Sequence, residues 1–340
     1  MTTGDNVSNI TDSELQEALV EFNQTFSSIE SEITRVIVGM QDIVRLTLSA
    51  VFAGGHVLLE GVPGLGKTLL VKSIAQTLGM SFKRIQFTPD LMPSDVTGTQ
   101  VLTEDEQGRR NFEFKPGPVF ANIVLADEIN RATPKTQSAL LEAMEEKQIT
   151  VLNETHALPR PFFVLATQNP IELEGTYPLP EAQLDRFLMK LLLKPPGSDE
   201  LKEVLNRTTG TIVPQARCVF PEGRATQIIE AMRLLVRKVM VADPMQEVLV
   251  RMIAALTPDS PYATEKVKRY VRFGPGPRGA QAVMMAGKVA AVLDSRINLA
   301  FEDIRTAILP ALRHRLVLNF QAEADGVTAD QIIEEVKNAR

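Results

Sequence analysis

The chain has 340 residues, long enough for two domains of ordinary size. Hydrophobic residues make up 44% and charged residues 23%, a globular composition that excludes a disordered chain. The formal net charge of −6 disfavours a duplex-DNA-binding protein, whose surface is usually basic. A single cysteine excludes an intrachain disulfide, and only three, widely separated histidines disfavour a zinc site.

The amino-terminal residues are not expected to form a secretory signal. Residues 1–10 are polar, lack the basic segment and apolar run of a secretory signal, and are expected to form a flexible tail. No run of 18 uninterrupted apolar residues occurs, so no membrane span is predicted. We therefore expect a cytoplasmic protein.

Helical and strand-like segments follow in a distinctive order. Apolar residues recur at spacings of three and four over Ser13–Val36, which predicts a helix, and a second helix is predicted over Met40–Ala53. Short apolar runs then alternate with helical segments, as in a five-stranded parallel sheet covered by helices on both faces. These runs are His56–Glu60, Arg84–Phe87, Asn122–Ala126, Phe162–Ala166 and Leu188–Leu193.

The pattern changes after a turn-forming segment, Lys194–Glu200. Beyond about residue 210 it is helical throughout, with Pro310 expected to kink or split one helix. The helices predicted there are Ala225–Val239, Pro244–Leu256, Arg278–Leu293, Phe301–Leu316 and Thr328–Asn338. We thus predict an α/β domain over residues 1–210 and an all-helical domain over residues 211–340.

The strongest motif is GVPGLGKT at residues 61–68, which matches the phosphate-binding pattern G-x-x-x-x-G-K-[ST] in full. A predicted strand precedes it and a predicted helix follows. Its glycines let the backbone turn so that successive N–H groups point at one anion, and the helix adds its positive N-terminal end. The segment is therefore predicted to be a phosphate-binding loop (P-loop).

Two side chains of the P-loop suit ATP with Mg²⁺. Lys67 is expected to contact the β- and γ-phosphates, and the Thr68 hydroxyl to be a ligand of Mg²⁺. The predicted nucleotide-contacting residues of this stretch are Gly61, Pro63, Gly64, Leu65, Gly66, Lys67, Thr68 and Leu69.

Polar side chains end two further predicted strands. Asp127 and Glu128 follow a buried run, and at the carboxyl end of a parallel strand both can reach a ligand. Asp127 would hold Mg²⁺ through its hydration shell and Glu128 would polarise the attacking water; two solvated acids at a strand end are the alternative. Asn169 ends the next run and could orient that water, or could simply begin a turn with Pro170. Arg186 precedes the fifth run, where it could instead form a surface ion pair with Asp185.

In this order the motifs resemble the AAA+ ATPase superfamily, and in particular its MoxR-type branch. The segments most similar to that branch are Leu125–Thr150, Phe163–Phe187 and His314–Ile333, and the resemblance covers roughly residues 30–338. It implies a P-loop α/β core and a C-terminal helical lid.

The resemblance also implies roles for single residues. Asp127 and Glu128 would be the Walker B pair, Asn169 the first sensor, and Arg186 an arginine finger that acts on a neighbouring subunit. Val38 and Gly39 would contact the adenine ring. Arg278 would be the second sensor and reach the γ-phosphate from the lid, although Gly276 stands where the family usually has a serine.

Two hairpins are predicted outside the nucleotide motifs. Thr97–Pro116 is expected to turn at Gln107 and Gly108, and Gln148–Arg160 to turn at Asn153. The branch of the superfamily that this chain resembles carries an insert in its second helix, which the first hairpin matches. Such hairpins could grip a client or pack against a neighbouring subunit or the lid, and the sequence favours neither.

The function that this resemblance implies is ATP hydrolysis in a ring, most simply a hexamer, that remodels a protein client. MoxR-type ATPases resemble chaperones for metalloenzyme complexes and work with von Willebrand factor A domain proteins. One alternative is a nucleic-acid-stimulated motor related to helicases; the acidic charge and 5% aromatic content weigh against a nucleic-acid partner. The other alternative is a nucleotide-dependent scaffold that binds ATP without hydrolysing it usefully. The presence of all three residues Glu128, Asn169 and Arg186 argues against it.

Overall fold

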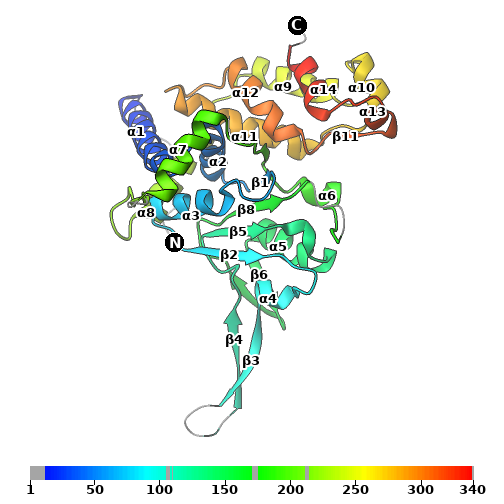
Figure 1. The fold of residues 1–340 in the computed structure, drawn as a ribbon. Helices are drawn as coiled ribbons and strands as arrows, with labels where there is room; N and C mark the ends of the chain where they lie inside the picture. Colours follow the sequence, from blue (N-terminus) through cyan, green and yellow to red (C-terminus); the bar gives the residue numbers. More distant parts are fainter. Residues whose placement is uncertain (1–11, 105–107, 109, 171–174, 211–213, 339–340) are drawn as a thin grey trace, which may run out of the picture.

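The computed structural model describes residues 12–104, 108, 110–170, 175–210 and 214–338, and the expected tail at residues 1–10 lies outside this part. Its centre is a five-stranded parallel sheet in the order β2-β5-β8-β1-β9 (Figure 1). The strands are β1 (Val57–Glu60), β2 (Phe82–Gln86), β5 (Ile123–Asp127), β8 (Phe163–Gln168) and β9 (Met189–Leu192). The five predicted strands and their parallel sheet are thereby confirmed.

Helices surround this sheet. They are α1 (Asp12–Val36), α2 (Gln41–Ala53), α3 (Lys67–Thr77), α4 (Pro93–Thr97), the 3₁₀ turn η1 (Ile129–Arg131), α5 (Pro134–Glu146), α6 (Glu181–Leu184) and α7 (Ser198–Thr209). The segment predicted only as a turn, Lys194–Glu200, therefore runs into α7. None of the described helices is both long and apolar enough to cross a bilayer.

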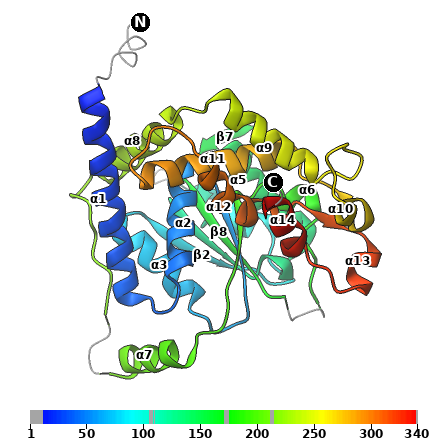
Figure 2. The same ribbon diagram turned by 90° about the horizontal axis from the view of Figure 1, so that it is seen from above.

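The rest of the described chain is mainly helical and spreads over the sheet when seen from above (Figure 2). Its helices are α8 (Ala225–Lys238), α9 (Asp243–Ala255), α10 (Glu265–Tyr270), α11 (Pro277–Leu293), α12 (Phe301–Leu312), α13 (Phe320–Ala324) and α14 (Ala329–Asn338). Pro310 lies inside α12, which continues past it but ends at Leu312 instead of Leu316. The prediction for this region omitted the short helices α10 and α13 and a short antiparallel pair of β10 (Val271–Phe273) and β11 (Val317–Leu318).

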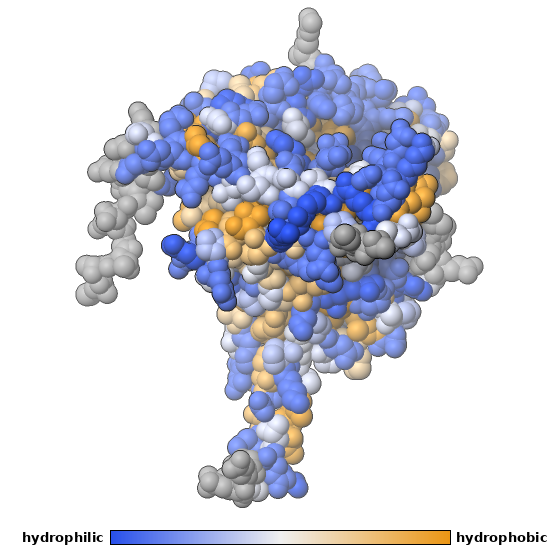
Figure 3. All heavy atoms as spheres, turned by 60° about the vertical axis from the view of Figure 1, so that its left-hand side comes forward, coloured by the Kyte–Doolittle hydropathy of each residue, from blue (hydrophilic) through white to orange (hydrophobic). Residues whose placement is uncertain are grey.

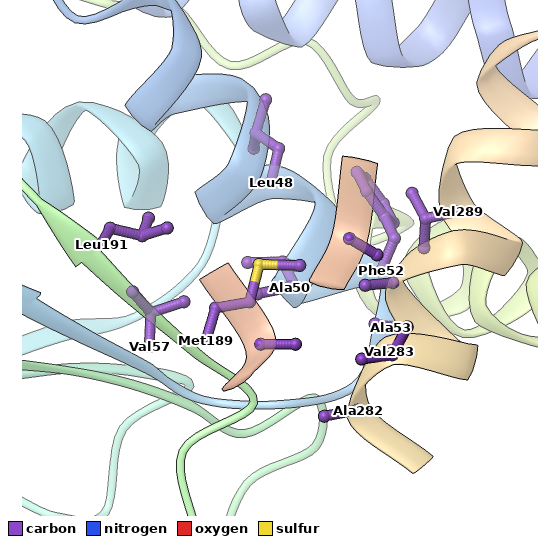
Figure 4. Packing of buried hydrophobic residues seen from close by; sticks show 14 of the residues in the cluster. Leu48, Ala50, Phe52, Ala53, Val57, Met189, Leu191, Ala282, Val283 and Val289 are labelled. Carbon is purple, nitrogen blue, oxygen red and sulfur yellow. The ribbon is translucent and has the colours of Figure 1, made fainter. Parts of the chain in front are cut away.

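Alternate side chains of the strands face two separate hydrophobic clusters. On β5, Ile123 and Leu125 join one cluster, whereas Val124 and Ala126 join the other. The first cluster continues from the sheet through α2 into the helical region, where Phe52 packs near Val283 and Val289 of α11 (Figure 4). One continuous core therefore fixes the helical region against the sheet.

Two antiparallel hairpins leave the core. β3 (Gly98–Glu104) pairs with β4 (Arg110–Pro116), and this hairpin protrudes far from the body (Figures 1 and 3). β6 (Gln148–Val151) pairs with β7 (Glu154–Ala157) through a two-residue turn. Leu152 and Asn153 both have positive φ there, as a type I′ turn requires. Both predicted hairpins are present; of the first predicted turn, Gly108 is described and Gln107 lies outside the described residues.

Candidate nucleotide-binding site

The P-loop lies at the carboxyl edge of the sheet, between β1 and α3. The N–H of Gly61 donates to the carbonyl of Gln168 at 3.2 Å, which ties the start of the loop to the end of β8. Gly64 and Gly66 have φ of +84° and +79°, values that side chains with a Cβ rarely adopt. The backbone therefore forms a concave turn at the N-terminus of α3, which suits an anion.

Lys67 is the first residue of α3 and is buried. Its Nζ donates to the carbonyl oxygen of Gly61 at 2.6 Å, across the mouth of the loop. Burial lowers the pKa of Lys67, while the carboxylates of Asp127 and Glu128 oppose this shift. The fold therefore brings this cation within electrostatic reach of Asp127 and Glu128.

Asp127, the last residue of β5, is held on both carboxylate oxygens. Oδ1 accepts from the Thr167 hydroxyl at 2.6 Å. Oδ2 accepts from Nε and Nη2 of Arg84 on β2, at 3.1 and 2.7 Å. The Asp127 side chain is thus fixed by the two strands that flank β5.

Glu128 leaves the strand with φ of +56° in the left-handed region, which turns its side chain along the sheet edge. Its Oε2 accepts from Gln86 Nε2 at 2.9 Å and from Arg131 Nη1 at 3.2 Å. Its backbone N–H donates to the hydroxyl of Thr167 at 2.8 Å. Thr167 therefore orients both members of the acidic pair.

The remaining predicted residues of this edge adjoin the P-loop. Asn169 directly follows β8 and is buried. Val38 and Gly39 lie between α1 and α2, and Gly39 with Met40 lines a cavity of about 1170 Å³ between α2, β9 and the helical region. A Cβ on Gly66 would lie 3.7 Å from Met40 Cε, so this cavity begins beside the P-loop.

Oxygen donors suited to Mg²⁺ are present at the same edge. The Thr68 hydroxyl follows Lys67, and the Asp127 carboxylate ends the second strand from β1. These are hard ligands, and Mg²⁺ typically takes one or two protein oxygens together with substrate phosphates and water. The described residues contain no cluster of three or more His, Cys, Asp or Glu side chains that could hold a metal by itself. The donor set therefore fits Mg²⁺ bound together with a nucleotide.

The two predicted arginines lie elsewhere, at the amino edge of the sheet. Arg186 Nη2 pairs with Glu145 Oε2 at 2.9 Å, not with Asp185. Arg278, near the start of α11, pairs with Oε1 of the same Glu145. With Gly55, which precedes β1, these groups line a cavity of about 280 Å³.

In this structure Arg278 lies away from the P-loop of its own chain, whereas the sequence predicts that it reaches the γ-phosphate from the lid. Gly55 lies beside Arg278, and Gly61 begins the P-loop. Between these two glycines the chain crosses the sheet over six residues, or about 20 Å at the rise of a strand. The cause is the packing of α11 on α2 and α8, which directs the start of α11 to the amino edge. Arg278 therefore lies with Arg186 and not with Lys67.

Several residues of these two sites were not singled out from the sequence. They are Arg84, Gln86, Glu145, Thr167 and Arg315. For Arg84 and Gln86 a signal existed, because two polar residues alternate with Ile85 and Phe87 along an apolar run, which the structure places at the edge strand β2. The pairings of Glu145 and Arg315 join distant parts of the chain, and no local pattern indicates them.

Comparisons with known proteins agree with this architecture. The ATPase family associated with various cellular activities (AAA) matches residues 56–189, and the AAA lid domain matches residues 264–336. The chain is 43% identical over 317 residues to uncharacterized protein YeaC of Bacillus subtilis, covering 90% of this chain and 91% of the relative. It is 41% identical over 305 residues to chaperone MoxR1 of Mycobacterium tuberculosis, covering 90% of this chain and 79% of that relative.

A crystal structure agrees as well. A candidate ATPase from Cytophaga hutchinsonii is similar at a TM-score of 0.87 and 39% identity, covering 95% of this chain and 96% of that one. The P-loop with its acidic pair, the lid and these relatives together show that the chain belongs to the MoxR-type AAA+ ATPases.

Proposed function

We propose that this chain hydrolyses ATP in a closed ring of identical subunits, most simply a hexamer, and that the cycle remodels a protein client. One observation carries the proposal. Lys67, Asp127 and Glu128 lie at one edge of the sheet, whereas Arg186 and Arg278 lie at the opposite edge of the same subunit. A head-to-tail arrangement brings the two edges of adjacent subunits together, and repetition of such an interface gives a ring when the rotation between subunits closes.

At the carboxyl edge each side chain has a distinct task. The P-loop N–H groups and Lys67 bind the phosphates, while Thr68 and Asp127 are the ligands of Mg²⁺ and its water. Bound Mg²⁺ supplies charge neutralisation on the phosphates. Glu128 accepts the proton of the attacking water, and Asn169 orients that water. Val38 and Gly39 contact the adenine ring.

At the amino edge, Arg186 and Arg278 serve the nucleotide of the neighbouring subunit. Guanidinium groups can meet phosphate oxygens with two parallel hydrogen bonds and stay charged at every physiological pH. An arginine supplied from a neighbour is typically worth ~10³–10⁵ in rate. The subunit alone is then a poor ATPase, and assembly completes its site.

The client is a protein under this proposal. A relative named chaperone MoxR1 supports this reading, and the resemblance to MoxR-type ATPases favours metalloenzyme complexes and a von Willebrand factor A domain partner. The protruding hairpin exposes two apolar side chains, Leu102 and Phe112, which are partners across its strands. Apolar groups are visible along this arm in Figure 3. Exposed apolar groups on a projecting arm suit contact with an unfolded or partly folded chain.

Two measurements on the full chain test this function. Specific ATPase activity is expected to rise with protein concentration, because dilution separates subunits and removes the arginines from the site. Single-stranded DNA is expected to leave the rate unchanged. A rate per subunit that is independent of concentration while the protein passes from monomer to oligomer would contradict the ring, and strong stimulation by DNA would favour a nucleic-acid motor.

A further inference from the structure

Glu145 joins arginines from two parts of the molecule. It lies in the last turn of α5, and each of its carboxylate oxygens faces one guanidinium group. Oε2 forms an ion pair with Arg186, which precedes β9, and Oε1 accepts a hydrogen bond from Arg278 of α11. One side chain therefore brings together two like charges that would otherwise repel each other.

A second ion pair fixes the surroundings of this contact. Arg315 is almost fully buried, with a side chain 4% exposed, and its Nε donates to Asp185 Oδ1 at 2.7 Å. Arg315 also donates from Nη2 to the carbonyl oxygens of Asp185 and Phe187, at 2.8 and 2.7 Å. The backbone on both sides of Arg186 is thus held rigidly. What remains adjustable is the direction of the two half-exposed guanidinium groups. Glu145 contacts both of them, and Asp185 Oδ2 adds a longer contact of 4.0 Å to Arg278 Nε.

The helix that carries Glu145 begins beside the subunit's own acidic pair. η1 starts directly after Glu128, and α5 follows with 13 residues, about 20 Å at the rise of a helix. α5 therefore spans from the carboxyl edge of the sheet to the amino edge. Its last turn meets both arginines, so the subunit's own nucleotide site and its arginine pair share one rigid element.

We propose that Glu145 is the positioning residue that presents Arg186 and Arg278 as a pair to the nucleotide of the neighbouring subunit. This inference rests on the proposed function, since it concerns the same arginines. Without Glu145, two adjacent cations would separate, and Arg278 with the start of α11 would lose one of its ties to the α/β core. Small errors in the placement of such groups cost on the order of 10²-fold in rate.

The first test compares turnover with binding in the full chain. Glu145→Ala is expected to lower kcat by about tenfold to a hundredfold. The Kd for ATP should stay within about twofold, because the P-loop lies about 20 Å away. Glu145→Asp keeps the charge and is expected to retain more activity than Glu145→Ala. Glu145→Gln keeps the shape but offers one carbonyl acceptor in place of two, so its kcat is expected to fall between those of the Asp and Ala variants.

The second test asks whether Glu145 acts through the arginines. In an Arg186→Ala, Arg278→Ala background, Glu145→Ala should cause little further loss, because the groups that it positions are already gone. The adjacent exposed acid Glu146, changed to Gln, is the matched control and should keep wild-type turnover. Wild-type kcat in both Glu145→Ala and Glu145→Gln would overturn the proposal. The proposal would also be overturned if Glu145→Ala lowered kcat by the same factor in the Arg186→Ala, Arg278→Ala background as in the wild type.

The failure of this inference can be told apart from failure of the proposed function. Arg186→Ala subunits mixed with Lys67→Ala subunits test the function alone, through recovery of ATPase activity. If that mixture recovers activity while Glu145→Ala is as active as wild type, only the role of Glu145 is wrong. If a co-assembled mixture does not recover activity, the arginines do not act between subunits and both proposals fail.

Discussion

Arg186 of the α/β core and Arg278 of the helical region meet at the same edge of the sheet, on opposite oxygens of one carboxylate. The position of the helical region is therefore coupled to the direction of Arg186. Any movement of α11 against the sheet changes what both arginines present to a neighbouring molecule. If the arginines serve a neighbouring subunit as proposed, this coupling would let motion of α11 in one subunit alter the site of the next.

The first prediction separates binding from hydrolysis. Lys67→Ala is expected to weaken ATP binding strongly, because the phosphates lose a buried cation. Glu128→Gln is expected to keep binding and abolish turnover, because an amide cannot accept the proton of the attacking water. Nucleotide binding by fluorescence and steady-state ATPase assays check both. Normal hydrolysis by Glu128→Gln would show that another group is the base.

The second prediction concerns stability in acid. His56 is buried, its Nδ1 accepts from the N–H of Val164 at 3.0 Å, and its Nε2 must therefore donate to the Met144 carbonyl at 3.2 Å. Burial lowers the pKa of His56 to about 4. The neutral ring is thus favoured in the folded state, and the unfolded chain binds the proton more readily between pH 6.5 and 4.

The contribution of His56 to the free energy of unfolding should therefore be fully present above pH 6.5. It should decrease by about 3 kcal/mol as the pH drops towards 4. Urea unfolding of wild type and His56→Gln across this range isolates the contribution, because His314, whose pKa burial also lowers, is common to both. The variant should show a shallower decline. Parallel profiles would mean that His56 does not titrate on unfolding.

The third prediction concerns the long hairpin. Replacing residues 104–110 by a short Gly/Ser turn is expected to leave basal ATPase activity and thermal stability unchanged, because the hairpin protrudes away from the core (Figure 1). Phe112→Ser, which removes an exposed apolar side chain, should reduce any stimulation of the ATPase by unfolded α-casein. Loss of ATP binding in the loop variant would show instead that the hairpin supports the nucleotide site.

The strands and the P-loop could be predicted because local patterns determine them. The apolar run Ile123–Ala126 is buried on both faces, and the full pattern G-x-x-x-x-G-K-[ST] between a predicted strand and a predicted helix identifies a phosphate loop. The position of Arg278 could not be predicted, because it depends on how α11 packs against α2 and α8. β10 and β11 were missed because strands of two or three residues carry no periodicity.

The fourth prediction distinguishes an arginine that acts within its own chain from one that acts on a neighbour. Arg278→Ala is expected to bind ATP and turn over poorly. Mixed with Lys67→Ala, it should recover activity, because the second subunit supplies an intact Arg278 to an intact P-loop. An arginine that acted within its own chain could not be replaced in this way, so absence of recovery in a co-assembled mixture would restore the within-chain assignment.

The most direct test of the whole account is the equivalent mixture of Arg186→Ala and Lys67→Ala subunits, with co-assembly verified by native mass spectrometry. Each variant alone should be nearly inactive. In a random equimolar ring, about a quarter of the interfaces join an intact P-loop to an intact Arg186, so activity should approach a quarter of the wild-type rate. No recovery in such rings, or full activity of Arg186→Ala on its own, would contradict the claim that a neighbouring subunit completes the site.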